Sequence, residues 1–161
     1  MVEILVVISI IGLLAGLGLP AINGAIKAGK KAEVAAMAES IKTAVNAYYA
    51  EYSTYPSNNG TTDSMFLTNM TTANTNGGNY RGIVFLEVTP KFTNADGLVT
   101  SKGFLSGGRQ TNFFVLIDTQ GLGYVNPKSV SRTLTNSNVP SSVAVWVVDP
   151  VKTNKAVGTF Q

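Results

Sequence analysis

The carboxylate of Glu3 is the chemical group in this sequence that is hardest to explain as ordinary structure. It is the only charged side chain before Lys27, and it lies in a leading run, MVEILVVISIIGLLAGLGLP, whose only other polar side chain is that of Ser9. A charge in the apolar part of a membrane segment costs roughly 2.5–3.5 kcal/mol. Glu3 therefore needs a cationic partner, or must lie near enough to the end of the run to reach lipid headgroups unpaired. We expect the first arrangement, because an unpaired Glu would be costly to keep.

Other residue types that carry chemistry are missing. The chain has no His and no Cys, which excludes the common zinc sites, Cys nucleophiles, disulfides and the most frequent general base. It has no close acidic pair, no Ser within a GxSxG pattern and no glycine-rich phosphate loop. The net charge of +3 is scattered rather than gathered in a basic stripe. We expect no enzymatic activity, no cofactor and no nucleic-acid partner.

A calcium loop is the one metal site whose spacing is partly present. Asp118 is followed by glycines, but the alternate positions that would supply oxygen ligands hold Gln120 and Leu122. Since a leucine side chain cannot bind calcium, this stretch favours a tight turn. Asp96 and Asp149 are isolated in the sequence. The sequence therefore predicts no metal site.

Gly12, Gly16, Gly18 and Pro20 are poor helix formers inside the leading run. Together they cost a helix roughly 6 kcal/mol relative to alanine, yet lipid enforces helical hydrogen bonding. We expect residues 13–20 to become irregular once the run leaves lipid for a protein assembly. Two alternatives stay open: a close helix–helix contact through Gly12 and Gly16, and a simple kink at Pro20.

Residues 1–20 must position these groups, and their length matches a bilayer-spanning helix. A cleaved signal peptide is the alternative, but nothing basic precedes the apolar residues and Glu3 stands where a Lys or Arg is usual. The basic cluster Lys27, Lys30 and Lys31 follows the run and fits a solvated face at the membrane boundary. The positive-inside rule alone would place this cluster, and the head with it, in the cytoplasm. That placement conflicts with a head on the outer side of the membrane. A basic leader upstream of Met1 would change the orientation that the rule predicts.

Residues 21–55 predict an amphipathic helix. Its apolar side chains recur every three or four residues, and Pro56 disfavours helix at Tyr55. A single helix from Met1 to Tyr52 would be roughly 75 Å long, too long for the core of a small head, so we expect its apolar half to protrude. The residues on its apolar face are Val34, Met37, Ile41, Val45, Tyr48 and Tyr52.

Residues 56–161 predict a loop-rich antiparallel β head. Residues 57–79 form a polar loop with one expected helical turn near Phe66, and its two glycosylation patterns, at Asn59 and Asn69, are typical of chance matches. Residues 80–88 fit a strand or a short helix equally. Residues 113–118 and 142–149 predict strands, and residues 119–123 predict a hairpin turn into residues 124–125. The tyrosines at 48, 49, 52 and 55 are explained by packing against the sheet, and Trp146 is expected in the core or an interface.

The leading run, the amphipathic continuation and the Tyr-Pro stop together carry a family resemblance. The matching residues are 2–8, 10–15, Pro20 and Tyr52-x2-Tyr55-Pro56, and more loosely 114–118 with Gly121 and Gly123, and 143–146. With these residues the chain resembles the type IV pilin superfamily, and more closely the major pseudopilins of type II secretion. Mature chains of that family open with an N-methylated Phe, a small or polar residue and Leu. Met1 stands at that Leu, so the Phe, the Gly before it and the basic leader are not in this sequence.

The resemblance implies an α+β fold of the type IV pilin kind: a long N-terminal helix whose apolar half protrudes and whose amphipathic half packs on a small antiparallel sheet. It implies a structural subunit that leaves the inner membrane to form a helical homopolymer in the periplasm or outside the cell. Its partners would be copies of itself, the assembly machinery and a prepilin peptidase. Glu3 would pair with the α-amino group of a neighbouring subunit. A monomeric, membrane-tethered periplasmic binding domain is the alternative, and pilus and pseudopilus remain undecided.

Overall fold

The computed structural model describes residues 2–71, 78–94, 99–101, 111–149 and 152–160, apart from the side chains of residues 17–20. Met1 and Asp96, which entered the sequence predictions, lie outside this description. Within it the chain is α+β, with a long apolar N-terminal helix and a three-stranded antiparallel sheet. The chain divides into two compact units, Met1–Glu33 and Val34–Gln161. The division falls inside residues 21–55, which the sequence predicts to be one helix.

Helix α1 runs without interruption over Val2–Tyr52. Its last turn is closed by the N–H of Ser53, which donates to the carbonyl of Tyr49 at 2.8 Å, and Ser53 itself has a φ of 53°. That left-handed residue and the Pro56 that follows end the helix. The expectation of a helix that stops at the Tyr-Pro stretch is confirmed, with its end three residues earlier than 55.

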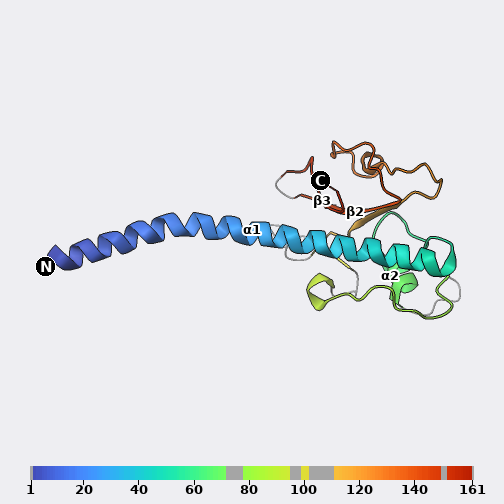
Figure 1. Ribbon diagram of the computed structural model, residues 1–161, viewed down its shortest axis with the longest axis horizontal. Helices are drawn as coiled ribbons and strands as arrows, with labels where there is room; N and C mark the ends of the chain where they lie inside the picture. Colours follow the sequence, from blue (N-terminus) through green and yellow to red (C-terminus); the bar gives the residue numbers. More distant parts are fainter. Residues whose placement is uncertain (1, 72–77, 95–98, 102–110, 150–151, 161) are drawn as a thin grey trace. The chain divides into compact units, whose positions relative to one another are not determined.

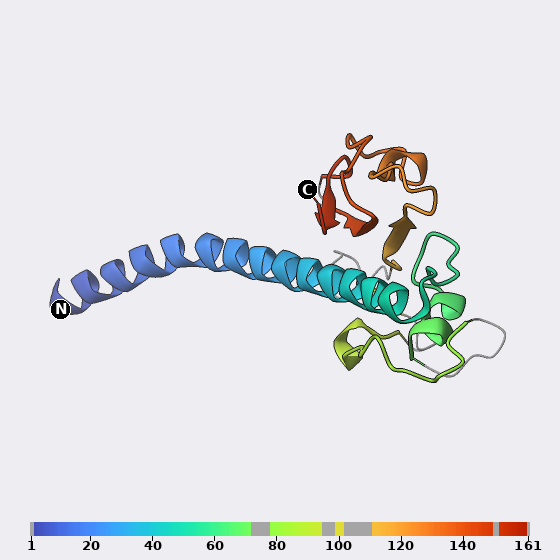
Figure 2. The ribbon, with the colours of Figure 1, turned by 45° about the vertical axis from the view of Figure 1, so that its right-hand side comes forward.

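The Val34–Gln161 unit contains all the other elements (Figure 1). They are α2 (Ser64–Thr71), the short helix η1 (Pro90–Phe92), β1 (Phe114–Ile117), the short helix η2 (Pro127–Ser129), β2 (Val143–Val148) and β3 (Ala156–Gly158). The strands lie in the order β1-β2-β3, and both pairs are antiparallel. Within this unit the C-terminal part of α1 lies between the sheet on one side and α2 on the other (Figures 1 and 2).

β2 holds the core together because it is buried on both faces. Its side chains alternate between two apolar clusters, as strand geometry requires. Val143, Val145 and Val147 share one cluster with α1 and α2. Ala144 and Trp146 belong to the second, which the segments on the other face of the sheet complete. The α1 and α2 residues of the first cluster with relative exposure of 2% or less are Val34, Ala38, Ile41, Ala44, Val45, Tyr48, Phe66 and Met70.

Helix α2 is longer than the single turn expected. Asp63 precedes it and caps it, because its Oδ1 accepts the N–H of Phe66 at 2.9 Å and its carbonyl accepts the N–H of Leu67 at 3.0 Å. Phe66 and Met70 then lie one turn apart and are fully buried. Phe66 and Met70 therefore belong to the inner face of a two-turn helix.

Two expectations about the head are corrected. Residues 80–88 form neither strand nor helix, and the N–H of Phe85 donates to the carbonyl of Met70 at 2.8 Å. Residues 119–123 do form a turn, but they do not connect a hairpin with residues 124–125. β1 pairs instead with β2, which brings Val115 opposite Val145, while Val125 pairs with Val139. A longer valine-rich strand that is buried on both faces offers β1 more apolar contact.

Gly158 in β3 is required by close packing. A Cβ there would overlap the carbonyl oxygen of Val145 and would lie 2.7 Å from the Cα of Trp146. We expect Gly158→Ala to destabilise the head by about 2 kcal/mol, measured by urea unfolding of the full chain in detergent. Gly29→Ala is the matched control, since nothing beyond the neighbouring backbone of α1 lies within 4 Å of its added methyl group. Equal stability of Gly158→Ala and the unmodified chain would show that β3 is not packed in this way.

Candidate functional site

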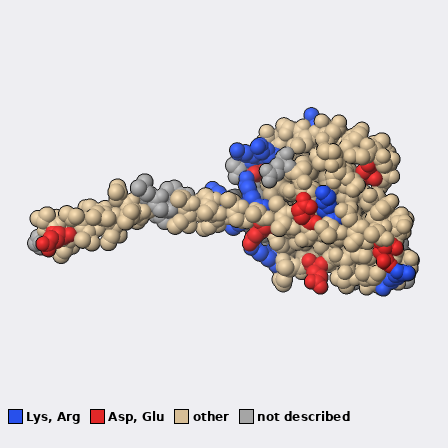
Figure 3. Space-filling model, viewed as in Figure 1, with Lys and Arg blue, Asp and Glu red and all other residues tan. Residues whose placement is uncertain are grey.

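The apolar surface of α1 is the candidate site. Every large apolar side chain between residues 2 and 14 is more than half exposed, from 52% for Val6 to 74% for Val2. These residues include consecutive positions, so they cover all sides of the helix rather than one stripe. Figure 3 shows this part of the chain as an almost uncharged surface. A helix that is apolar all round needs an apolar environment on every side.

α1 is long and apolar enough to cross a membrane, and none of its most apolar stretch is buried within the chain. The core helix of a soluble protein would be buried, so that explanation does not fit. A signal sequence would have the same length and composition. Helix α1 can therefore anchor the chain in a membrane.

Glu3 lies in the first turn of α1 and is exposed. There the positive end of the helix dipole favours a carboxylate. Among the residues that the structure describes, no Lys or Arg forms an ion pair with it. The other polar side chain of the run needs no partner, because the Ser9 hydroxyl donates to the carbonyl of Leu5 at 2.7 Å. Glu3 is thus the one polar group of the run for which the described residues supply no partner.

The predicted assembly residues do not gather at one point. Glu3 and Pro20 are separated by about 26 Å along a straight helix. Apart from the neighbouring backbone of α1, no atom lies within 4 Å of a Cβ built at Gly12 or Gly16, so no contact within the described chain requires a glycine there. Gly18 and Pro20 lie within α1, but what surrounds them is outside the description. The backbone of this single chain is helical over residues 13–20, and irregularity in the assembled state stays a prediction.

The Asp118 turn is built from backbone hydrogen bonds. The carboxylate accepts the N–H of Leu122 at 3.0 Å and that of Gly123 at 2.7 Å, while Gly121 and Gly123 have φ of 70° and 79°. All the carboxylate's described partners are donors of its own turn. Among the described residues no three His, Cys, Asp or Glu side chains gather. The prediction of a tight turn at this position is confirmed.

Protonation of Asp118 is expected to loosen this turn. The N–H of Leu122, and after it those of Gly123, Gln120 and Gly121, hold the pKa of Asp118 below its ordinary value of 3.8. The contribution to stability is therefore complete above the unfolded-state pKa and is lost as the pH falls through the lower folded-state pKa. We expect the amide resonances of Leu122 and Gly123 to titrate with a midpoint below 3.8, and Asp118→Asn to abolish that titration. A midpoint at or above 3.8 would contradict these bonds.

The tyrosines at the end of α1 pack within the head. Tyr48 contacts Tyr52 and Phe85, with ring centroids 4.7 and 5.3 Å apart, and Tyr52 contacts Tyr80 at 5.1 Å. Burial raises the pKa of the Tyr48 hydroxyl, and the neighbouring Tyr52 and Tyr80 raise it further. The packing explanation holds: Tyr48 shares an apolar cluster with Val143, Val145 and Val147 of β2, and Phe85 of the segment after α2 also packs against that cluster.

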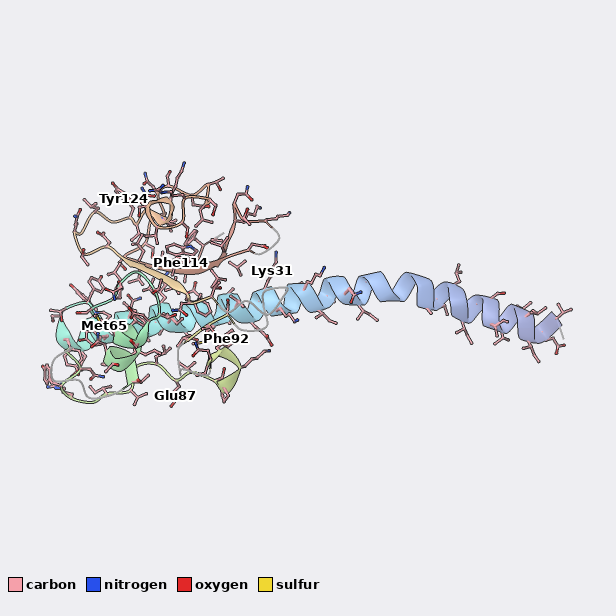
Figure 4. The ribbon with its side chains drawn as sticks, turned by 180° about the vertical axis from the view of Figure 1, so that it is seen from behind. Lys31, Met65, Glu87, Phe92, Phe114 and Tyr124 are labelled. Carbon is pink, nitrogen blue, oxygen red and sulfur yellow. The ribbon has the colours of Figure 1, made fainter. Side chains whose placement is uncertain are left out.

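Sequence reasoning missed an open groove beside α1. We call it the α1 groove: it encloses about 680 Å³ and is lined by Ala36, Glu39, Ser40, Thr43, Ala44 and Ala47 of α1 and by Val84, Phe85, Leu86 and Glu87. Figure 4 shows Glu87 on the side of α1 opposite to Phe114 and Tyr124. The four-residue spacing of small side chains in α1 was the available signal. Whether these small side chains line a groove depends on the path of residues 84–87, which the sequence pattern left undecided.

Comparisons with known proteins give no match: no protein-family model fits the chain, and neither the curated proteins nor the solved structures contain a similar one.

Proposed function

We propose that the chain is a structural subunit of a type IV pilus-like filament or type II secretion pseudopilus. Met1–Leu19 holds it in the inner membrane before assembly, and the subunits then polymerise into a helical filament in the periplasm or outside the cell. The observation that carries the proposal is the apolar surface of residues 2–14, which is exposed on all sides of α1. The pilin resemblance of the same residues adds to it.

The driving force in this proposal is the exchange of lipid for neighbouring helices. Lipid tails and a bundle of apolar helices both satisfy the surface of residues 2–14, so the transfer depends on packing and on polar groups. The glycines at 12 and 16 permit close approach of helices. Glu3 adds a charge that is costly in lipid and is neutralised by a partner in the bundle. Assembly is therefore favoured, and Glu3 selects the register between copies.

Electron microscopy separates this proposal from a monomeric membrane-tethered binding domain. The chain is expressed with its native assembly machinery, and the sheared and periplasmic fractions are imaged after labelling with an antibody to residues 111–149. Labelled filaments are expected. If the chain is found only as a detergent-soluble monomer in the inner membrane, the proposal is overturned and the tethered domain is favoured. Mass spectrometry of the purified filament also identifies the N-terminal residue of the mature subunit.

A further inference from the structure

The floor of the α1 groove is suited to another helix. Ala36, Ser40, Thr43 and Ala47 are exposed side chains at helical spacing along one face of α1. Both hydroxyls are already bonded to α1 itself: Ser40 donates to the carbonyl of Ala36 at 3.1 Å and Thr43 to that of Glu39 at 2.9 Å. The floor therefore has small side chains whose polar atoms need no further partner.

The edges of the groove are acidic and apolar. Glu39 and Glu87 line it and are exposed, and no Lys or Arg is among its described lining residues. Val84 adds an apolar side chain that is 56% exposed. An occupant that matches this surface has apolar side chains in a row with basic side chains beside them.

Residues 22–30 of α1 have this complementary pattern. Ile22 and Ile26 lie one turn apart and are 57% and 52% exposed. Lys30 continues the same row after another turn, and Lys27 lies beside it. Both lysines are exposed, and they follow the apolar run of residues 1–20. This stretch, the 22–30 segment, is thus an apolar and basic surface that no described contact covers.

A copy of the chain cannot place this segment in its own groove. α1 is a continuous helix from Val2 to Tyr52, so the 22–30 segment cannot fold back on residues 36–47 of the same helix. The groove and the segment are also two different surfaces. A contact between different surfaces of identical chains joins them head to tail, and it gives an open helical polymer when the rotation does not close.

We propose that the 22–30 segment of one copy packs, in parallel orientation, in the α1 groove of a second copy. The contact rests on the proposed filament, in which all subunits have the same polarity. Ile22 faces Ala36 and Ile26 faces Ser40, so the copies are displaced by about 21 Å along the helix axis. Lys27 then lies about 3 Å along the axis from the level of Glu39, within reach of its carboxylate.

Cross-linking tests this arrangement directly, because the chain has no cysteine. In filaments of the Ile26→Cys, Ser40→Cys double variant, mild oxidation is expected to give a ladder of disulfide-linked multimers on a non-reducing gel. Either single variant gives no ladder, and coexpression of the two single variants gives linked dimers. The matched control is Ile26→Cys with Ser129→Cys, an exposed serine that does not line the groove, and it gives no ladder.

A charge exchange tests the polar part of the contact. We expect Lys27→Glu and Glu39→Lys each to lower filament yield about tenfold or more, and the double exchange to restore it. Lys128→Glu is the control for charge reversal at an exposed site outside the groove and is expected to have no effect. Circular dichroism of each variant checks that the chain is folded.

The outcomes distinguish the two proposals. Filaments of the Ile26→Cys, Ser40→Cys double variant that give no ladder, or a double charge exchange that fails to restore yield in folded protein, overturn the groove contact and leave the filament proposal standing. A ladder from the Ser129→Cys control also overturns the groove contact. If the unmodified chain forms no filaments with its machinery present, the proposed function itself has failed.

Discussion

Glu3→Leu is expected to leave the chain in the membrane and to lower filament yield about tenfold or more. The substitution removes a charge whose insertion costs roughly 2.5–3.5 kcal/mol, so the helix enters lipid more readily. In the filament the same change leaves the partner of Glu3, which the pilin resemblance implies is the α-amino group of a neighbour, without its counter-ion. Assembly then no longer removes a costly carboxylate from lipid, and it loses the attraction between Glu3 and the neighbouring subunit that sets the register. Sheared filaments and membrane-bound subunit are quantified by immunoblot from the same cells.

Two further substitutions at this position separate charge from shape. Glu3→Gln keeps the size and removes the charge, and we expect it to assemble as poorly as Glu3→Leu. Glu3→Asp keeps the charge and is expected to recover part of the yield. All of these variants should remain inserted in the membrane, which sodium carbonate extraction checks. Filaments at the normal yield from Glu3→Leu would show that Glu3 has no role in assembly.

Trp146→Ala is expected to destabilise the head by about 4 kcal/mol. Trp146 is fully buried in β2. Its ring stacks on Phe114 and meets Phe160 edge-on, each at a centroid distance of 5.4 Å. Truncation leaves a large cavity in the second apolar cluster, where Leu134 and Val139 also lie. Urea unfolding of the full chain in detergent, followed by far-ultraviolet circular dichroism, measures the change because the variant has no tryptophan fluorescence.

Trp146→Phe is the informative control for this site. The Trp146 Nε1–H has no hydrogen-bond partner among the described residues, so phenylalanine removes an unpaired buried donor as well as some volume. We expect Trp146→Phe to lower the free energy of unfolding of the head by less than about 1.5 kcal/mol, because the aromatic contact remains. If Trp146→Phe were as destabilising as Trp146→Ala, the indole N–H would have to be bonded after all.

The elements that sequence analysis located correctly are those with local signals. Period-3.6 spacing from Val34 to Tyr52 and the Tyr-Pro stop located the second half of α1 and its end, and runs rich in Val, Phe and Ile located β1 and β2. The cap of α2 was overlooked because Asp63 lies in a polar stretch that was treated as loop. Residues 80–88 have no clear period, since they are held by contacts such as Phe85 with Met70 rather than by their own pattern.

The assembly residues were identified from the cost of a charge in lipid, from helix propensity and from the pilin resemblance, and the structure adds the surroundings of Glu3, Gly12 and Gly16. Gly12 and Gly16 have open space around them, which matches a role outside the single chain but does not test it. The α1 groove could not be predicted, because it is formed by α1 together with a segment more than thirty residues later in the chain.

The sequence by itself determined that this protein starts with an apolar helical run that carries a single charge, continues as an amphipathic helix and ends in a β head, because each of these depends on neighbouring residues. Only the tertiary structure decided which strand pairs with β1, where residues 82–89 run and which face of α1 the head leaves uncovered. Those features depend on contacts between distant parts of the chain, where many pairings satisfy the local pattern and packing selects one.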